Sequence, residues 1–394
     1  MSETENRIPM LDLAAQHADI KEELLSGFAS ILDMGHFVLG DSVQAFESDL
    51  ARLCEVRHGL SCNSGTDALW LALRGLGIGD GDAVLCPAYS FFATAATIVR
   101  VGAIPIFCDI DPATLNLDPQ DAIRRIETTP NLRAVISVDL FGRACELGEL
   151  AEICRDRDLP IIQDAAQSIG AVDSQGEKIG KATRIACFSF YPTKNLGALG
   201  DAGGLVTSDK DLRDEIARLR VHGEIEPGLF GKIGINSRMD ALQAVALSVK
   251  LRHLERWTQT RRRLALQYDA LFAERGATPG NERISAGRLR LQTPVAACDP
   301  ARHTYHRYVV RVDAQTRPGL VRALEEEGIA SEIYYHRGLH EQPALQAYRP
   351  EIPLPETERA SRETLALPLF PELGADGVER VIGVVTRTLE AAQV

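Results

Sequence analysis

The residue in this sequence with the clearest potential for covalent chemistry is Lys194. It follows an apolar run over residues 185–190 that predicts a buried strand, and it precedes a glycine-rich turn over residues 197–204. An amine held among aromatic side chains and backbone loses its proton more easily and can then attack a carbonyl to form an imine. Lysines in loops are more often solvated, so this interpretation depends on the other residues of the site.

A second chemical signal lies at the start of a predicted helix. Gly65 and Thr66 come directly before the helical pattern of residues 68–73. The first turn of a helix has unbonded N–H groups and the positive end of the helix dipole, so this position can bind a phosphate. An ordinary helix cap formed by Ser64 or Thr66 is the alternative interpretation.

Two further candidates follow predicted strands. Phe91 comes after the strand of residues 83–86 and could cover a flat ring, although an aromatic side chain here also suits a core. Asp164 stands at the tip of the strand of residues 161–163, where a buried carboxylate is unfavourable unless a positive group meets it. A helix cap would also explain this aspartate.

Together these residues match the functional groups of pyridoxal 5′-phosphate. Lys194 would bind the aldehyde of this cofactor, and Gly65 and Thr66 would bind its phosphate. Phe91 would cover the ring. Asp164 would keep the pyridine nitrogen protonated, so that the ring can accept electrons from a carbanion. The joint match favours the chemical interpretation over the structural one at each position.

The elements that position these residues alternate between strands and helices. This alternation predicts a parallel sheet with helices on both faces, and such sheets carry their sites at the carboxyl ends of the strands. The predicted strands are 83–86, 104–108, 134–140, 161–163, 185–190 and 205–208. After an extended arm from residue 7, the predicted helices are 20–33, 42–54, 91–101, 119–126, 146–157 and 210–221.

The remaining residues predict a smaller second domain. After a loop over residues 223–234, a long helix is predicted to start near Met239 and to continue past Leu254, and residues 278–296 are polar and irregular. Beyond them the predicted elements are strands 308–312 and 330–335 and helices 318–327, 357–365 and 375–392. We expect an N-terminal arm and large cofactor-binding domain in residues 1–260, and a small C-terminal domain in residues 261–394.

Composition narrows the class of protein. The 394 residues are 45% apolar and 25% charged, and the net charge of −12 argues against nucleic-acid or anionic-membrane partners. The polar, acidic N-terminus does not resemble a signal peptide, and prolines and Arg100 interrupt the longest apolar stretch, so we expect a cytoplasmic protein. The cysteines form no CxxC pair and are expected to be reduced core residues rather than metal ligands. They are Cys54, Cys62, Cys86, Cys108, Cys145, Cys154, Cys187 and Cys298.

The sequence resembles the DegT/DnrJ-type sugar aminotransferases, which have fold type I of the aspartate aminotransferase superfamily. The resemblance runs from IPMLDL and GHFVLG through NSGTDAL, PAYSFFAT, DIDPATLNLDP, QDAAQSIGA and SFYPTKNLGALGD to GINSRMDALQA and YYHRGLHEQPAL. It therefore covers nearly the whole chain. It implies an α/β fold with a mixed, mostly parallel seven-stranded sheet in the large domain and an α+β small domain.

The resemblance also implies roles for individual residues. It assigns the covalent attachment of pyridoxal 5′-phosphate and the other cofactor contacts to Lys194, Asp164, Gln167, Gly65, Thr66, Ser189 and Phe91. In the family's GxNxR motif, here Gly234, Asn236 and Arg238, the asparagine reaches the phosphate of the other subunit, which implies a homodimer with shared active sites. Plausible substrate residues are His222, His306, Tyr335 and His336, although a structural hydrogen bond would also explain each histidine.

The substrates are implied by the same resemblance. L-Glutamate is the expected amino donor and a nucleotide-linked keto-sugar the expected acceptor, with FYPTKNLGALGD closer to relatives that aminate C3 than to those that aminate C4. Lysine rather than histidine at position 194 favours transamination over sugar dehydration. Ala202 and Asp139 depart from the residues common in relatives, and Asp139 leaves the substrate open. The alternatives are a 4-keto-sugar or cyclitol aminotransferase, a lyase, or a non-catalytic sensor that binds an aminosugar.

Overall fold

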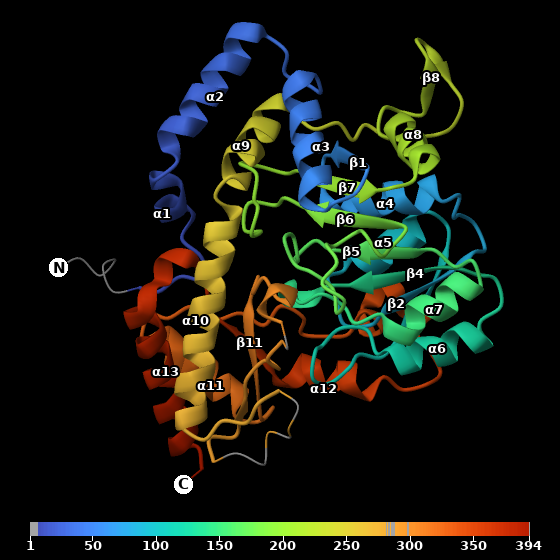
Figure 1. The fold of residues 1–394 in the computed structure, drawn as a ribbon. Coiled ribbons are helices and arrows are strands. Elements are labelled where there is room, and N and C mark those ends of the chain that lie inside the picture. The colour runs from blue at the N-terminus through green and yellow to red at the C-terminus, as the bar shows by residue number, and fades with distance from the viewer. Residues whose placement is uncertain (1–6, 281, 283, 285–287, 298, 394) are drawn as a thin grey trace.

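A seven-stranded sheet forms the centre of the large domain (Figure 1). The computed structural model describes residues 7–280, 282, 284, 288–297 and 299–393. The strand order is β1-β7-β6-β5-β4-β2-β3, and only β7 runs opposite to the other strands. The prediction of a mixed, mostly parallel sheet is therefore confirmed. The strands are β1 His58–Cys62, β2 Ala83–Pro87, β3 Ile104–Cys108, β4 Leu132–Val138, β5 Ile161–Asp164, β6 Ile185–Ser189 and β7 Gly203–Thr207.

Helices cover both faces of this sheet. Alternate residues of one strand point to opposite faces, so Ala134 and Ile136 of β4 join the core beneath α4, α5 and α8, whereas Val135 joins the core beneath α6 and α7. The helices α3 and α9 cover β6 and β7 on the same face of the sheet as α6 and α7. Helices of this domain are α1 Leu13–Ala18, α2 Lys21–Met34, α3 Asp41–Leu53, α4 Gly65–Gly75, α5 Ala93–Arg100, α6 Pro119–Thr128, α7 Gly148–Asp156, α8 Lys210–Leu219 and α9 Ala241–Leu251.

The C-terminal part packs around a second core. Its sheet has the order β10-β11-β12, and apolar side chains of α10, α11 and α13 pack with that sheet in one buried cluster. Figure 1 shows α10, in yellow, running from α9 alongside α13. The elements are α10 Leu254–Glu274, β10 Leu291–Gln292, β11 Tyr308–Val312, α11 Arg317–Glu326, α12 Pro355–Glu363, β12 Thr364–Leu367 and α13 Gly374–Ala391.

Several sequence predictions were wrong in detail. The long helix predicted from Met239 is two helices, because α9 ends at Leu251 and α10 begins at Leu254. The predicted strand 330–335 makes only an isolated bridge from Glu332 to Ala366, on the edge of β12 that faces away from β11. The predicted helix 357–365 ends at Glu363 because β12 begins at Thr364.

Other elements were missing from the prediction. β1 was not predicted because its sequence, HGLSC, lacks an apolar alternation. Gly59 permits its close packing, since a Cβ atom there would lie 2.2 Å from the Glu47 carbonyl oxygen of α3. α1 lies in the predicted arm, and the short hairpin of β8 Glu224–Glu226 and β9 Leu229–Phe230 lies in the predicted loop 223–234. The last two glycines of the predicted turn 197–204 belong to β7.

The cysteines in the described part of the chain fit the prediction of reduced core residues. Each of the seven that the structure describes is buried and unpaired, and Cys298 lies outside the described residues. No helix among the described residues is long and apolar enough to cross a membrane.

A buried lysine on α9 supports the loop that follows β6. Lys250 is 0% exposed, and its Nζ donates a hydrogen bond to the Gly197 carbonyl oxygen at 2.7 Å. No carboxylate of the described residues pairs with it, and burial lowers the pKa of this amine to about 8. Its charge is therefore unfavourable in the folded protein.

We expect this lysine to make stability depend on pH. The folded pKa of about 8 lies below the ordinary value of 10.5, so between these values the unfolded chain binds more protons and stability rises with pH. Relative to a Lys250→Met variant, the unfolding free energy of the parent should increase across this window, by about 1.4 kcal/mol per unit of pKa difference. Urea denaturation at a series of pH values would measure it, and parallel curves for the two proteins would contradict it.

Candidate active site

A cavity of about 490 Å³ opens at the carboxyl ends of β4, β5 and β6. Val138, Asp164 and Ser189, which end these strands, line it, as expected for a site in a parallel sheet. The structure brings most of the sequence-predicted residues together here. Those that line the cavity are Gly65, Thr66, Phe91, Asp164, Gln167, Ser189, Lys194, His306 and Tyr335.

Lys194 is held by a tight turn after β6. Its backbone N–H donates to the Tyr191 carbonyl at 2.8 Å, and a hydrogen bond from Ala198 to Phe190, also 2.8 Å, closes the loop. The side chain borders the cavity, and burial lowers the pKa of its amine to about 8, with the charge of Arg307 adding to this effect and Asp164 opposing it. Roughly a tenth of the amine is therefore deprotonated at pH 7, far more than for a lysine with the ordinary pKa.

Asp164 is a buried carboxylate at the end of β5. It is 6% exposed, and it accepts hydrogen bonds from the Thr94 hydroxyl at 2.9 Å and from the Ala166 N–H at 3.3 Å. Burial raises the pKa of this carboxyl. No helix begins directly after it, so the helix-cap interpretation of this aspartate was wrong. A positive or N–H group in the cavity would complete its surroundings.

The start of α4 forms another part of the cavity wall, next to the end of β6. Ser64 caps the helix by accepting a hydrogen bond from the Asp67 N–H at 3.0 Å, so the cap and the phosphate interpretations are compatible. Gly65 and Thr66 are the first helical residues, and their N–H groups have no acceptor within the helix. A Cβ atom on Gly65 would lie 2.7 Å from the Ser189 Cβ, so only glycine permits this close approach of α4 to β6.

Aromatic side chains and Gln167 form another wall. Gln167 accepts a hydrogen bond from the Phe141 N–H at 2.7 Å and donates one to the Tyr335 hydroxyl at 3.2 Å. The rings of Phe141 and Tyr335 stack with centroids 6.0 Å apart. Phe91 lies just before α5 and is 59% exposed, so its ring is free to cover a ligand at the cavity mouth.

Three predicted residues do not line this cavity. His222 and His336 are exposed. Asn236 is also exposed, and its side-chain oxygen accepts a hydrogen bond from the Arg238 Nε at 3.1 Å. His306, in contrast, is buried in the wall, with its Nδ1 3.1 Å from the Asn195 side-chain oxygen.

Sequence reasoning missed some residues of the site. Thr94 could have been detected, since it is a hydroxyl in the first turn of a mostly apolar helix that follows a strand end. Arg307 directly precedes the apolar strand β11, which was also a detectable signal. Phe141 and Tyr334 carry no distinguishing pattern, because aromatic residues at such positions are usually core.

Comparison with known proteins identifies the relatives of this chain. The model of the DegT/DnrJ/EryC1/StrS aminotransferase family matches residues 18–386. A pleiotropic regulatory protein of Geobacillus stearothermophilus is 40% identical over 377 residues, which are 95% of this chain and 96% of that protein. The UDP-N-acetyl-3-dehydro-alpha-D-glucosamine 3-aminotransferase of Acidithiobacillus ferrooxidans is 39% identical over 97% of this chain and 98% of its own.

The fold matches solved structures equally well. The crystal structure of S. venezuelae DesV in complex with a ketimine intermediate aligns with a TM-score of 0.89 and 34% identity. The alignment covers 98% of this chain and 99% of that one. The likeness therefore extends over nearly the whole chain, including the segments that line the cavity.

Proposed function

Because this chain belongs to the DegT/DnrJ/EryC1/StrS aminotransferase family, whose chemistry uses pyridoxal 5′-phosphate, we propose that it moves an amino group from L-glutamate to a nucleotide-linked 3-keto-sugar. The observation that carries the proposal is the meeting of a buried amine, Lys194, and a buried carboxylate, Asp164, in one cavity. The relative that acts on UDP-N-acetyl-3-dehydro-glucosamine supports the choice of acceptor.

The residues of the cavity fit pyridoxal 5′-phosphate. Its 490 Å³ lie within the range of cofactor sites. The N–H groups of Gly65 and Thr66 and the Ser189 hydroxyl would hold the phosphate, in a cradle that a Cβ atom on Gly65 would fill. Asp164 would hold the pyridine nitrogen, Phe91 would cover the ring, and Gln167, which lines the same cavity, would contact the ring hydroxyl. When bound, the cofactor supplies an electron sink for a carbanion.

The protein groups supply binding and proton transfer. The Nζ of Lys194, with a pKa of about 8, can accept the proton that an amino-acid substrate loses from its α-carbon and can return it. Asp164 is held in place by Thr94, so its carboxylate keeps one orientation toward the cavity. Phe141, Tyr334 and Tyr335 line the same cavity and reduce its contact with water.

Amino transfer can be tested directly. The cofactor-loaded protein should convert L-glutamate to 2-oxoglutarate in proportion to the aminosugar formed from UDP-N-acetyl-3-dehydro-glucosamine. A 4-keto nucleotide sugar and a keto-cyclitol serve as alternative acceptors. Transfer only to one of these would replace the acceptor in the proposal. Tight binding of an aminosugar nucleotide without any transfer would establish the sensor alternative instead.

We also propose that the active form is a homodimer with shared sites. Asn236 lies outside its own cavity, next to the β8–β9 hairpin, and apolar side chains are exposed on that hairpin and after it: Ile225 49%, Leu229 51%, Phe230 56% and Ile233 85%. Such a patch is typical of a subunit interface. Mixing inactive Lys194→Ala and Asn236→Ala variants should restore activity in hybrid dimers.

We further propose the domain division at residues 260 and 261, which falls within α10, and a cytoplasmic location, which the unpaired cysteines support.

The cradle at Gly65 gives a prediction about cofactor retention. Gly65→Ala places a Cβ atom 2.7 Å from that of Ser189, so α4 and β6 must separate and cofactor affinity should fall at least ~10-fold. The absorbance of bound pyridoxal 5′-phosphate during dialysis would measure it. Gly319→Ala is the matched control, since nothing lies within 4 Å of its Cβ position and it also lies early in a helix. Equal retention by both variants would contradict the prediction.

A further inference from the structure

Arg307 is a buried cation in the wall of the 490 Å³ cavity at the strand ends, called the large cavity below. It directly precedes β11, it is 5% exposed, and it lines the cavity together with His306 and Tyr334. Its Nη1 donates to the His306 carbonyl oxygen at 2.9 Å, its Nε donates to the Tyr334 hydroxyl, and the guanidinium lies 5.2 Å from the centre of the Tyr334 ring. Every one of these partners is neutral.

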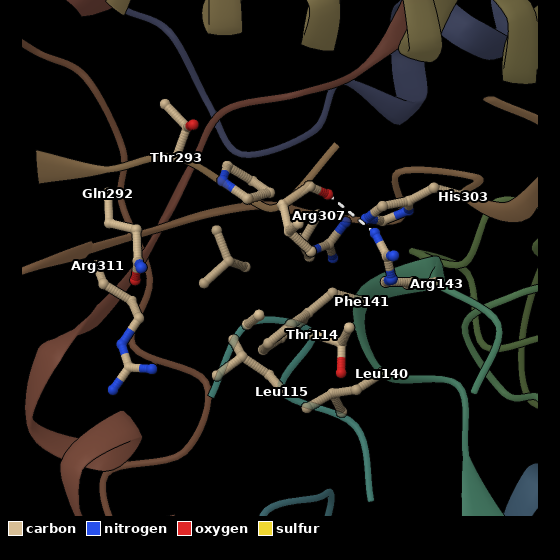
Figure 2. Close-up of a pocket in the computed structure, with 14 residues that line it drawn as sticks. Thr114, Leu115, Leu140, Phe141, Arg143, Gln292, Thr293, His303, Arg307 and Arg311 are labelled. Carbon is tan, nitrogen blue, oxygen red and sulfur yellow. Dashed lines mark hydrogen bonds between the residues drawn. The ribbon is translucent and has the colours of Figure 1, made fainter. Parts of the chain in front are cut away.

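No carboxylate of the described residues pairs with this arginine. Its neighbours Arg143 and Arg311 are paired, since Arg143 lies 3.4 Å from Glu146 and Arg311 lies 2.8 Å from Glu363. Figure 2 shows these three arginines around a second, small pocket that also contains Phe141 and His303. Arg307 therefore differs from the other two in lacking a protein counter-ion.

Of the two pockets beside Arg307, the large cavity has the room for an anionic substrate. The small pocket has a volume of about 30 Å³, which has room for water but not for a substrate. The large cavity of about 490 Å³ is bordered by the same arginine. The proposed cofactor phosphate lies at the start of α4, whereas Arg307 belongs to the wall formed by β11 and Tyr334, so the two positions are distinct.

The charges that line the cavity leave Arg307 without a paired counter-ion. Two cations, Lys194 and Arg307, and two carboxylates, Asp164 and Asp201, line it, and the charge of Asp164 acts on Lys194. The charge of Arg307 acts on its surroundings, because it helps to lower the pKa of both Lys194 and His306. A buried, unpaired charge is unfavourable until an opposite charge meets it. A guanidinium that is already fixed by neutral hydrogen bonds is well arranged to bind a carboxylate with its remaining donors.

We propose that Arg307 binds a carboxylate of a substrate in the large cavity, a subsite that rests on the proposed aminotransferase function. The carboxylate belongs either to the amino-acid donor or to an acidic acceptor sugar. The two sources share the same chemistry at Arg307. In either case this residue determines which substrates the cavity accepts.

Binding measurements separate these sources. Titration calorimetry of the cofactor-loaded protein would use three probes: 2-oxoglutarate, UDP-N-acetylglucosamine and its C6 carboxylate form, UDP-N-acetylglucosaminuronate. Arg307→Gln should weaken the carboxylate probe that uses this subsite at least ~30-fold, because a charge-assisted hydrogen-bonded pair is lost. Arg307→Lys should recover most of the affinity. The affinity for UDP-N-acetylglucosamine and the cofactor content should not change.

The outcomes are distinct. A loss limited to 2-oxoglutarate assigns the subsite to the amino donor, and a loss limited to the uronate assigns it to the acceptor. Unchanged binding of both carboxylates, or an equal loss for the neutral sugar nucleotide, would overturn the proposal. If Arg307→Gln does not fold, Arg307→Lys and Arg307→Met are titrated with the same probes under the same criteria. Because binding is measured without turnover, the result stands even if no keto-sugar is aminated.

Discussion

Replacing Lys194 with alanine is expected to lower the rate of amino transfer by at least ~10⁴-fold, because it removes both the covalent attachment and the group that moves the proton. The amine is well suited to both tasks, since burial lowers its pKa to about 8. Single-turnover kinetics with L-glutamate would measure the loss. Borohydride reduction of the loaded parent should also fix the cofactor to the peptide that contains Lys194.

A matched lysine controls for charge and solubility. Lys181 is exposed and makes only surface ion pairs with Glu55 and Glu177, so Lys181→Ala should keep the parent rate within about 2-fold. A Lys194→Ala protein that turns over within 10-fold of the parent, or a reduced cofactor found on another peptide, would refute the assignment of this residue.

The second large effect is expected for Asp164→Asn, which should lower the rate by about 10³-fold. Asparagine preserves the shape and can still accept the Thr94 hydrogen bond, but it carries no charge to hold a protonated pyridine nitrogen. The folded protein should keep nearly its full stability, because burial makes the charged form of Asp164 unfavourable and raises the pKa of its carboxyl. Stopped-flow spectroscopy of the loaded protein with L-glutamate would measure the rate.

Asp139 provides the corresponding control. It is also a buried aspartate, but it accepts hydrogen bonds from the Ser168 hydroxyl at 2.6 Å, the Gln163 amide at 3.0 Å and the Cys145 N–H at 2.9 Å. Asp139→Asn should therefore lower stability by about 1–3 kcal/mol and leave the rate per folded molecule within a few-fold. If the two variants lost rate equally, the special role of Asp164 would be excluded.

The sequence predicted the fold where patterns are local. The strands predicted at 104–108 and 308–312 coincide with β3 and β11, because apolar runs bounded by turn residues leave little choice. β1 and β12 escaped prediction because their pairing partners, β7 and β11, are distant in the sequence and determine them more than their own residues do.

The sequence predicted those residues of the candidate site whose chemical type is unusual for their position. An amine, a carboxylate and a glycine at a helix start can be recognised by their position next to strand ends, and the family and cofactor that they predicted are confirmed by the comparisons. Residues that act through contacts made by folding cannot be recognised in this way. Arg307 shows the limit, since only the structure reveals that Glu146 and Glu363 neutralise its neighbours and leave it unpaired.

The continuous helix α10 affects how the protein unfolds. Its 21 residues continue across the proposed domain boundary, and within it Arg261 donates to the Leu369 carbonyl at 2.7 Å and Arg262 to the His303 carbonyl at 3.0 Å. A chain cut at residue 260 would end in mid-helix, so the last carbonyl groups of the shortened helix would lose their N–H partners, and both arginine bonds would be absent from that fragment. The two proposed domains should therefore unfold in one calorimetric transition. Fragments that end at residue 260 should be degraded quickly rather than accumulate.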